Sequence, residues 1–153
     1  MIYIARPCQF VKDSKCECKY WTTARFAPEV ITAIGQAVKL STKQPVILIG
    51  YSGGAQVAGL IATRIHLKKI ITIAGVLDHK AWTTYHNDPP LMESLNLATF
   101  GDLAQIHYIG AKDDVVPPKL TQQFIKDKNL IVIVPNATHD RGWDAILSEL
   151  YAE

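Results

Sequence analysis

Three residues of the chain have the types needed for nucleophilic catalysis, and each follows an apolar run that predicts a strand. They are Ser52, Asp113 and His139, in that order along 153 residues. A serine hydroxyl becomes a good nucleophile only when a base removes its proton, and a histidine base needs a carboxylate to fix its tautomer. The sequence therefore predicts Ser52 as nucleophile, His139 as general base and Asp113 as the group that orients the histidine.

The serine lies in the pattern G-x-S-x-G, written here as GYSGG over residues 50–54. Such a match arises by chance in roughly one chain of this length in twenty. The sequence around the motif makes a catalytic role more plausible, because an apolar run precedes the motif and a helical pattern follows it, as a strained nucleophile elbow requires. The N–H group of Gly53, at the start of that helix, is the predicted donor to an oxyanion. The alternatives are a helix-capping serine or a phosphate site at the helix N-terminus.

Five histidines compete for the role of base. His66 ends the helix after the serine and His107 lies inside an apolar strand, so both are interpreted as structural. His79 and His86 lie in a long connection from which either can approach the site. His139 follows the last predicted strand, and its position fits the base best.

The acid is expected just beyond the preceding strand, where Asp113 and Asp114 stand side by side. The alternative interpretation is that the two aspartates only stabilise a solvent-exposed turn, as aspartates in loops often do. The order serine, aspartate, histidine is the order of the α/β-hydrolase triad, and it differs from the orders found in other serine hydrolases. The chain order therefore favours a catalytic acid in this loop.

Five short apolar runs alternate with segments of helical periodicity. Continuous apolar runs are typical of strands buried on both faces of a parallel sheet, and alternation with helices is typical of a doubly wound layer fold. The predicted fold is one α/β domain over residues 1–153, with a mostly parallel sheet of about five strands and flanking helices. The expected strands cover residues 2–5, 46–50, 70–74, 105–109 and 130–134, and the helices start near 28, 55, 118 and 143.

Three separate segments resemble the α/β-hydrolase family. GYSGG resembles its elbow, GAKDDVVPP its acid loop G-x-x-D-x-x-V-P, and ATHDRGW its histidine loop. The acid-loop pattern aligns Asp113, not Asp114, with the family's acid. The resemblance also implies that the chain begins after the family's first strands and after the loop that donates the second oxyanion N–H. We expect either a truncated member, or a first strand at residues 2–5 that moves beside the elbow strand so that ARPCQ replaces this loop.

The N-terminal segment contains all three cysteines, Cys8, Cys16 and Cys18. The residues alone leave open a disulfide from Cys8 to either of the others, or three free thiols, and no histidine lies among them to complete a zinc site. ARPCQ, a following cysteine and YWT-x-x-R-F-x-P-E-V resemble a bacterial branch of the family. That resemblance implies a Cys8–Cys16 disulfide.

Four aromatic residues are candidates for the substrate pocket. The bacterial branch has a segment like LDHKAWTTYH, which implies that Trp82 and Tyr85 form part of the pocket wall. Tyr51 precedes the serine and Trp143 follows the histidine loop, and both are further candidates.

Composition excludes several classes of protein. With 48% hydrophobic and 20% charged residues, the chain is typical of globular proteins. The net charge of +2 is scattered, so no nucleic-acid partner is expected. The apolar runs are too short to span a bilayer, and the first ten residues lack a signal-peptide pattern. We expect a periplasmic or envelope protein if a leader precedes Met1, and a cytoplasmic protein otherwise.

The leading hypothesis is a serine hydrolase that acts on a small ester-type substrate by acyl transfer, as a carboxylesterase does, with no metal and no cofactor. Turnover is expected to be slow if one oxyanion donor is missing. A second hypothesis is a non-catalytic α/β-hydrolase-like remnant or binding module, which includes a homo-oligomer formed through an exposed sheet edge. A third is a flavodoxin-like phosphate-binding module, which needs neither Asp113 nor His139.

Overall fold

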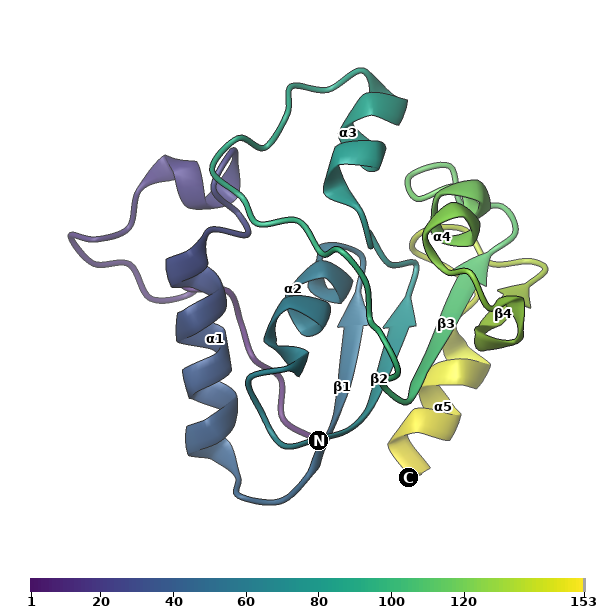
Figure 1. The fold of residues 1–153 in the computed structure, drawn as a ribbon, viewed down its shortest axis with the longest axis horizontal. Coiled ribbons are helices and arrows are strands. Elements are labelled where there is room, and N and C mark those ends of the chain that lie inside the picture. The colour runs from purple at the N-terminus through teal and green to yellow at the C-terminus, as the bar shows by residue number, and fades with distance from the viewer. Residues whose placement is uncertain (153) are drawn as a thin grey trace.

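Four parallel strands form one sheet in the order β1-β2-β3-β4 within residues 1–152, the part of the chain that the computed structural model describes (Figure 1). The register aligns Gly50 with Thr72 and Thr72 with His107, so the carboxyl ends of the strands lie at one edge. The predicted α/β class with a parallel sheet is confirmed. The strands are β1 (Val46–Tyr51), β2 (Leu67–Ile73), β3 (Gln105–Gly110) and β4 (Ile131–Val134).

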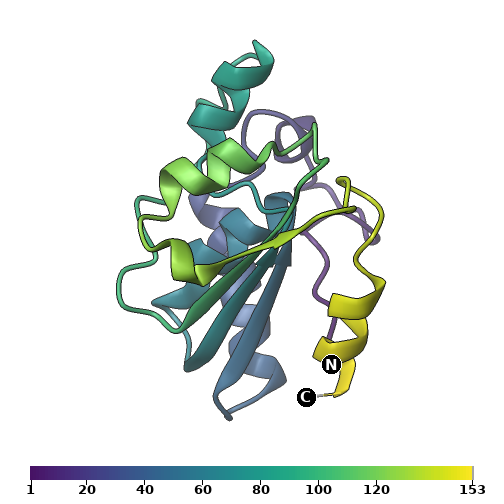
Figure 2. The ribbon, with the colours of Figure 1, turned by 90° about the vertical axis from the view of Figure 1, so that its right-hand side faces the viewer.

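Helices cover both faces of the sheet, as a doubly wound fold requires. Apolar side chains of α1, α2 and the end of α4 pack on one face, and those of α5 on the other (Figure 2). In α1, Pro28 occupies the first turn, and Val30, Ile34 and Val38 are buried as their helical spacing predicts. The helices are α1 (Pro28–Ser41), α2 (Gly53–Ala62), α3 (His79–His86), α4 (Pro118–Phe124) and α5 (Asp144–Ala152), with short 3-10 turns η1 (Cys18–Trp21) and η2 (Lys128–Leu130).

The strand expected at residues 2–5 is absent, so the described sheet has four strands where about five were expected. Ile2 and Tyr3 are exposed, and Ile4 alone packs against the core from this segment. A strand exists only where a neighbour completes its hydrogen-bond ladder, and within residues 1–152 β1 pairs with β2 alone. The arrangement in which residues 2–5 move beside the elbow strand is therefore not the one found.

The connection between β2 and β3 contains α3, which the sequence did not predict. Asp78 caps this helix, because its Oδ1 accepts hydrogen bonds from the backbone N–H groups of Lys80 and Ala81. Figure 1 shows α3 beyond the carboxyl ends of β1 and β2, on the side to which the arrowheads point. The helix therefore lies at the edge of the sheet where the site is expected. The helix expected to start near residue 118 is α4, which ends at Phe124.

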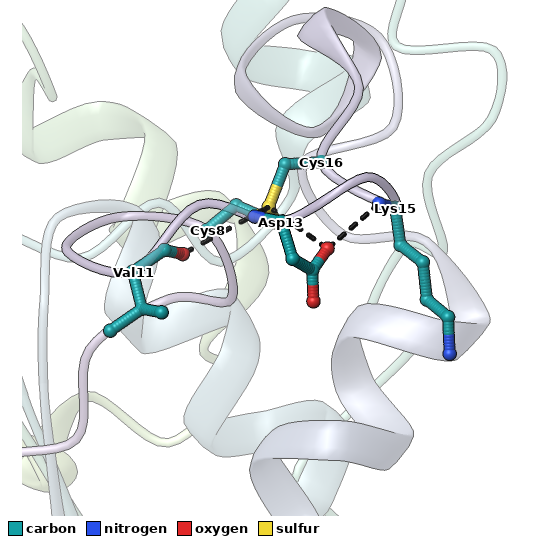
Figure 3. Close-up of a disulfide and its surroundings, with 5 residues drawn as sticks. All are labelled: Cys8, Val11, Asp13, Lys15 and Cys16. Atoms are coloured by element: carbon teal, nitrogen blue, oxygen red, sulfur yellow. Dashed lines mark hydrogen bonds between the residues drawn. A yellow bond between two sulfur atoms is a disulfide. The ribbon is translucent and has the colours of Figure 1, made fainter.

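The structure contains a disulfide between Cys8 and Cys16, with Cα atoms 5.6 Å apart (Figure 3). The backbone N–H of Asp13 donates to Cys16 Sγ at 3.3 Å, and the Asp13 carboxylate accepts from the N–H of Lys15. A disulfide sulfur has no hydrogen, so its contact with the Val11 carbonyl oxygen, 3.9 Å away, is not a donated bond. Cys18 is a free, exposed thiol.

Candidate active site

The turn between β1 and α2 holds Ser52 in a strained backbone conformation, with φ 50° and ψ −124°. Such a conformation costs about 1–3 kcal/mol and persists only where its surroundings fix it. Here the N–H of Ser52 donates to the Ile73 carbonyl, and the Ser52 carbonyl accepts from the N–H of Val76. Ile73 is the last residue of β2 and Val76 follows it by three residues, so the end of β2 and the segment after it hold the turn in place.

Gly50 is the small residue that lets the turn close. A Cβ atom at this position would lie 2.6 Å from the Ala55 Cα and from the Gly54 carbonyl oxygen. Gly54, the other glycine of the motif, has open space where a Cβ would be. The requirement for a small flanking residue therefore applies to one side of Ser52 only.

Asp113 is buried just after β3, and its two carboxylate oxygens have separate roles. Its Oδ1 accepts hydrogen bonds from the backbone N–H groups of Val115 at 2.9 Å and Val116 at 2.7 Å. Its Oδ2 lies 3.0 Å from Nδ1 of His139. The turn thus fixes the carboxylate so that one oxygen is directed at the histidine. Asp114 is exposed.

His139 joins the carboxylate to the serine. Its Nε2 lies 3.1 Å from Ser52 Oγ, and its side chain is 11% exposed. Because an ionised carboxylate only accepts, the proton of a neutral His139 ring lies on Nδ1, and Nε2 is free to accept from the Ser52 hydroxyl. The structure brings together Ser52, Asp113 and His139, the three residues that the sequence singled out.

The backbone of the histidine loop is held by two aromatic side chains. The carbonyl of His139 accepts from Trp143 Nε1 at 2.9 Å and from the Tyr51 hydroxyl at 3.1 Å. The Tyr51 hydroxyl has one proton, which is shared between this carbonyl and Asp140 Oδ1 at 2.8 Å, and its ring centroid is 5.2 Å from that of His139. Tyr51 and Trp143 were candidates for the pocket, and the structure gives both a hydrogen bond to the loop that carries His139.

The acid and histidine loops also touch each other directly, at the end of β3. A Cβ atom on Gly110 would lie 2.6 Å from the Ala137 carbonyl oxygen, so glycine is needed for this close approach. The N–H of Lys112 donates to the same carbonyl at 3.0 Å. This contact sets the spacing between Asp113 and His139.

The other pocket candidates, Trp82 and Tyr85, lie on α3. Trp82 Nε1 donates to the Val115 carbonyl in the acid loop at 2.7 Å. Tyr85 is 44% exposed, and the Lys119 ammonium lies 4.2 Å from the centroid of its ring. The structure therefore places Trp82 against the acid loop and Tyr85 at the contact between α3 and α4.

Gly53 begins α2, where a helix leaves its first N–H groups without intrahelical partners. This N–H group directly follows Ser52 and lies at the positive end of the helix dipole. The Phe26 ring would lie 3.5 Å from a Cβ on Gly53, and it stacks on the His79 ring with centroids 5.8 Å apart. Burial lowers the pKa of His79, so this ring is neutral at pH 7. Phe26 thus lies beside Gly53, the predicted oxyanion donor; it belongs to the YWT-x-x-R-F pattern, which assigned it no role in the site.

Comparison with solved structures identifies the fold. An alpha/beta hydrolase enzyme from the metagenome of sediments of the Mar Chica lagoon, Morocco, superimposes with a TM-score of 0.56 at 15% identity over 81% of this chain and 68% of its own. The esterase domain of a Rhodothermus marinus protein gives 0.59 at 18% identity over 79% of this chain and 64% of its own. An alpha-beta serine hydrolase homologue from Coxiella burnetii gives 0.57 at 18% identity over 96% of this chain and 63% of its own.

The chain has an α/β-hydrolase fold. At 15–18% identity the likeness concerns the fold alone, and the chain spans 63–68% of the length of these three proteins. No family model matches the chain, and no curated protein matches it in sequence. In this α/β-hydrolase fold, the turn that carries Ser52 follows β1, an edge strand of the described sheet, and the loops that carry Asp113 and His139 follow β3 and β4.

Two kinds of feature are absent from residues 1–152. No cluster of three or more histidine, cysteine, aspartate or glutamate side chains is arranged to hold a metal ion. No helix in the same residues is long and apolar enough to cross a membrane.

Proposed function

We propose that this chain is a serine hydrolase that cleaves an ester-type bond of a small molecule, as a carboxylesterase does, by acyl transfer through Ser52. The observation that carries the proposal is the continuous contact from Asp113 Oδ2 to His139 Nδ1 at 3.0 Å and from His139 Nε2 to Ser52 Oγ at 3.1 Å. The neighbours' hydrolase fold supports the same conclusion.

In the first half of the reaction, His139 Nε2 takes the hydroxyl proton while Ser52 Oγ forms a bond to the carbonyl carbon. The carbonyl oxygen becomes an oxyanion, which the Gly53 N–H and the N-terminus of α2 stabilise. The tetrahedral intermediate collapses, the bond to the alcohol oxygen breaks, and His139 gives its proton to the leaving alcohol. Asp113 stabilises the imidazolium between these two transfers.

In the second half, a water molecule attacks the acyl-enzyme. His139 takes a proton from the water, the acyl–Oγ bond breaks, and the proton returns to Ser52. The net reaction is ester plus water to acid plus alcohol. Because Gly53 is the one oxyanion donor assigned, turnover is expected to be about 10²- to 10³-fold slower than with a two-donor site.

The proposal is tested by turnover of p-nitrophenyl acetate and butyrate. The wild-type chain is expected to exceed both Ser52→Ala and His139→Ala by several orders of magnitude. Ser148→Ala and His66→Ala, at exposed positions remote from these contacts in sequence, serve as matched controls and should keep the wild-type rate. A wild-type rate no higher than that of Ser52→Ala would contradict the proposal.

A further inference from the structure

Helix α3 is attached at its beginning to the helix that follows Ser52. Asn96 makes this attachment, since its Oδ1 accepts from Gln56 Nε2 of α2 at 3.1 Å and from the backbone N–H of His79 at 2.9 Å. Its Nδ2 donates to Asp78, the residue that caps α3, at 2.8 Å. Gln56 is fully buried one turn after the nucleophile. The beginning of α3 is therefore fixed relative to the elbow.

The other end of α3 is attached to the acid loop. Trp82 Nε1 donates to the Val115 carbonyl oxygen at 2.7 Å, and His86 Nε2 lies 2.8 Å from the same oxygen. A carbonyl oxygen only accepts, so His86 Nε2 carries a proton here. The two aromatic rings pack together with centroids 4.9 Å apart. Two side chains one turn apart on α3 thus converge on a single acceptor.

The peptide group that receives these bonds also holds the catalytic candidate Asp113. The Val115 carbonyl and the Val116 N–H belong to one planar peptide unit, so fixing the direction of one fixes the other. The Val116 N–H makes the shorter of the two bonds to Asp113 Oδ1, at 2.7 Å. Donation to the carbonyl also polarises the peptide and strengthens its N–H as a donor.

We propose that α3 is a positioning strut that sets Asp113 relative to Ser52, with Trp82 and His86 as positioning residues that act through the Val115–Val116 peptide. The consequence for catalysis rests on the proposed function. The strut itself concerns the orientation of the Asp113 carboxylate, and hence the tautomer of His139, which is measurable without any substrate.

The role of His86 depends on its N–H and not on its charge, because Nε2 carries a proton in both the Nε2–H tautomer and the imidazolium form. His86→Gln retains an amide donor at a similar reach, whereas His86→Phe keeps a flat ring and loses the donor. Trp82→Phe likewise keeps the ring and loses the N–H. Trp21→Phe is the matched control, since Trp21 lies on η1 and its ring faces Lys12.

The test measures the tautomer of His139 by two-bond ¹H–¹⁵N correlation spectra, which use carbon-bound ring protons. Wild type, Trp21→Phe and His86→Gln are expected to show the Nδ1–H form. The double variant Trp82→Phe/His86→Phe is expected to show a mixture of Nδ1–H and Nε2–H forms. The second-order rate of labelling by a fluorophosphonate should fall about tenfold in the double variant. In Trp21→Phe and His86→Gln it should stay near the wild-type rate.

The outcomes separate the strut from the proposed function. A double variant with the wild-type tautomer and the wild-type labelling rate overturns the strut and leaves the hydrolase proposal in place. If the double variant shows the tautomer mixture but the fluorophosphonate does not label even the wild type, the result supports the strut and counts against the hydrolase proposal. Circular dichroism shows whether the double variant folds. If it does not, His86→Phe is compared with His86→Gln. The proposal is overturned if His139 has the same tautomer in both variants.

Discussion

The Tyr51 hydroxyl donates a hydrogen bond at 3.1 Å to the carbonyl of His139, which lies 88 residues later in the sequence, and its ring packs against the imidazole. Desolvation and then the Asp140 carboxylate raise the pKa of Tyr51 to about 12, so the hydroxyl keeps its proton at neutral pH. Tyr51, the residue before Ser52, therefore helps to hold His139.

Removal of this hydroxyl should loosen the histidine loop. We expect Tyr51→Phe to lower ester turnover by about 3- to 10-fold, the effect of one or two lost hydrogen bonds, while Trp143 still holds the loop. Tyr3→Phe, at an exposed position, is the control. A Tyr51→Phe variant with the wild-type rate would show that Trp143 is sufficient.

The acid can be neutralised without disturbing its turn. In Asp113→Asn the amide oxygen can still accept from the Val115 and Val116 N–H groups, but the amide N–H faces His139 Nδ1 and favours the wrong tautomer. Ester turnover is expected to fall by roughly 10⁴-fold. Asp114→Asn, next to it and exposed, should retain activity. The assignment of Asp113 fails if the two variants behave alike.

His107 makes the fold sensitive to acid. The ring is fully buried in β3 between Thr72 Oγ1 at 2.8 Å and Gln105 Oε1 at 2.9 Å, and burial lowers its pKa to about 4. The unfolded chain binds a proton at this ring below about pH 6.5, and the folded chain does so only near pH 4. Its contribution to stability is therefore complete above pH 6.5 and is lost as the pH falls to 4.

This loss amounts to roughly 2 kcal/mol at pH 5 and is measurable by urea unfolding at pH 7 and pH 5. The decrease in the unfolding free energy between these pH values should be smaller in His107→Gln than in wild type. His66→Gln, at an exposed position, should show the wild-type decrease. Equal decreases in all three proteins would assign the acid sensitivity to other groups.

The Cys8–Cys16 disulfide closes a short loop, with a sequence separation of 8, before α1. Loop-closure entropy for this length corresponds to about 2–3 kcal/mol. We expect a reductant, or Cys8→Ser with Cys16→Ser, to lower the thermal midpoint by about 5–10 °C. Cys18→Ser should leave the midpoint unchanged, since Cys18 is a free thiol. A midpoint that does not respond to reduction would mean that this loop unfolds separately from the core.

Sequence patterns predicted the parts of the fold that local residues determine. Each of the four strands overlaps one of the predicted apolar runs, and Ser52, Asp113 and His139 follow three of these strands, so the topology gathers them at one edge of the sheet. The run at residues 2–5 has the same composition but no neighbour to complete its ladder, and a sequence does not reveal a missing neighbour.

Helix α3 was missed because it has little apolar periodicity, with His79 and Thr83 its buried residues. The capping aspartate Asp78 was the available signal for its start. The contacts that hold the site were also beyond sequence reasoning, because Trp82 and Tyr51 bond to backbone groups 33 and 88 residues away. Such bonds depend on the tertiary arrangement and leave no periodicity.

The most direct test of the central claim is covalent labelling by a fluorophosphonate, which reacts with a serine only when that serine is activated as a nucleophile. Peptide mapping by mass spectrometry is expected to find one adduct per chain, on Ser52, with labelling abolished in Ser52→Ala and strongly slowed in His139→Ala. A wild-type chain that stays unlabelled, or an adduct that persists in Ser52→Ala, would contradict the account.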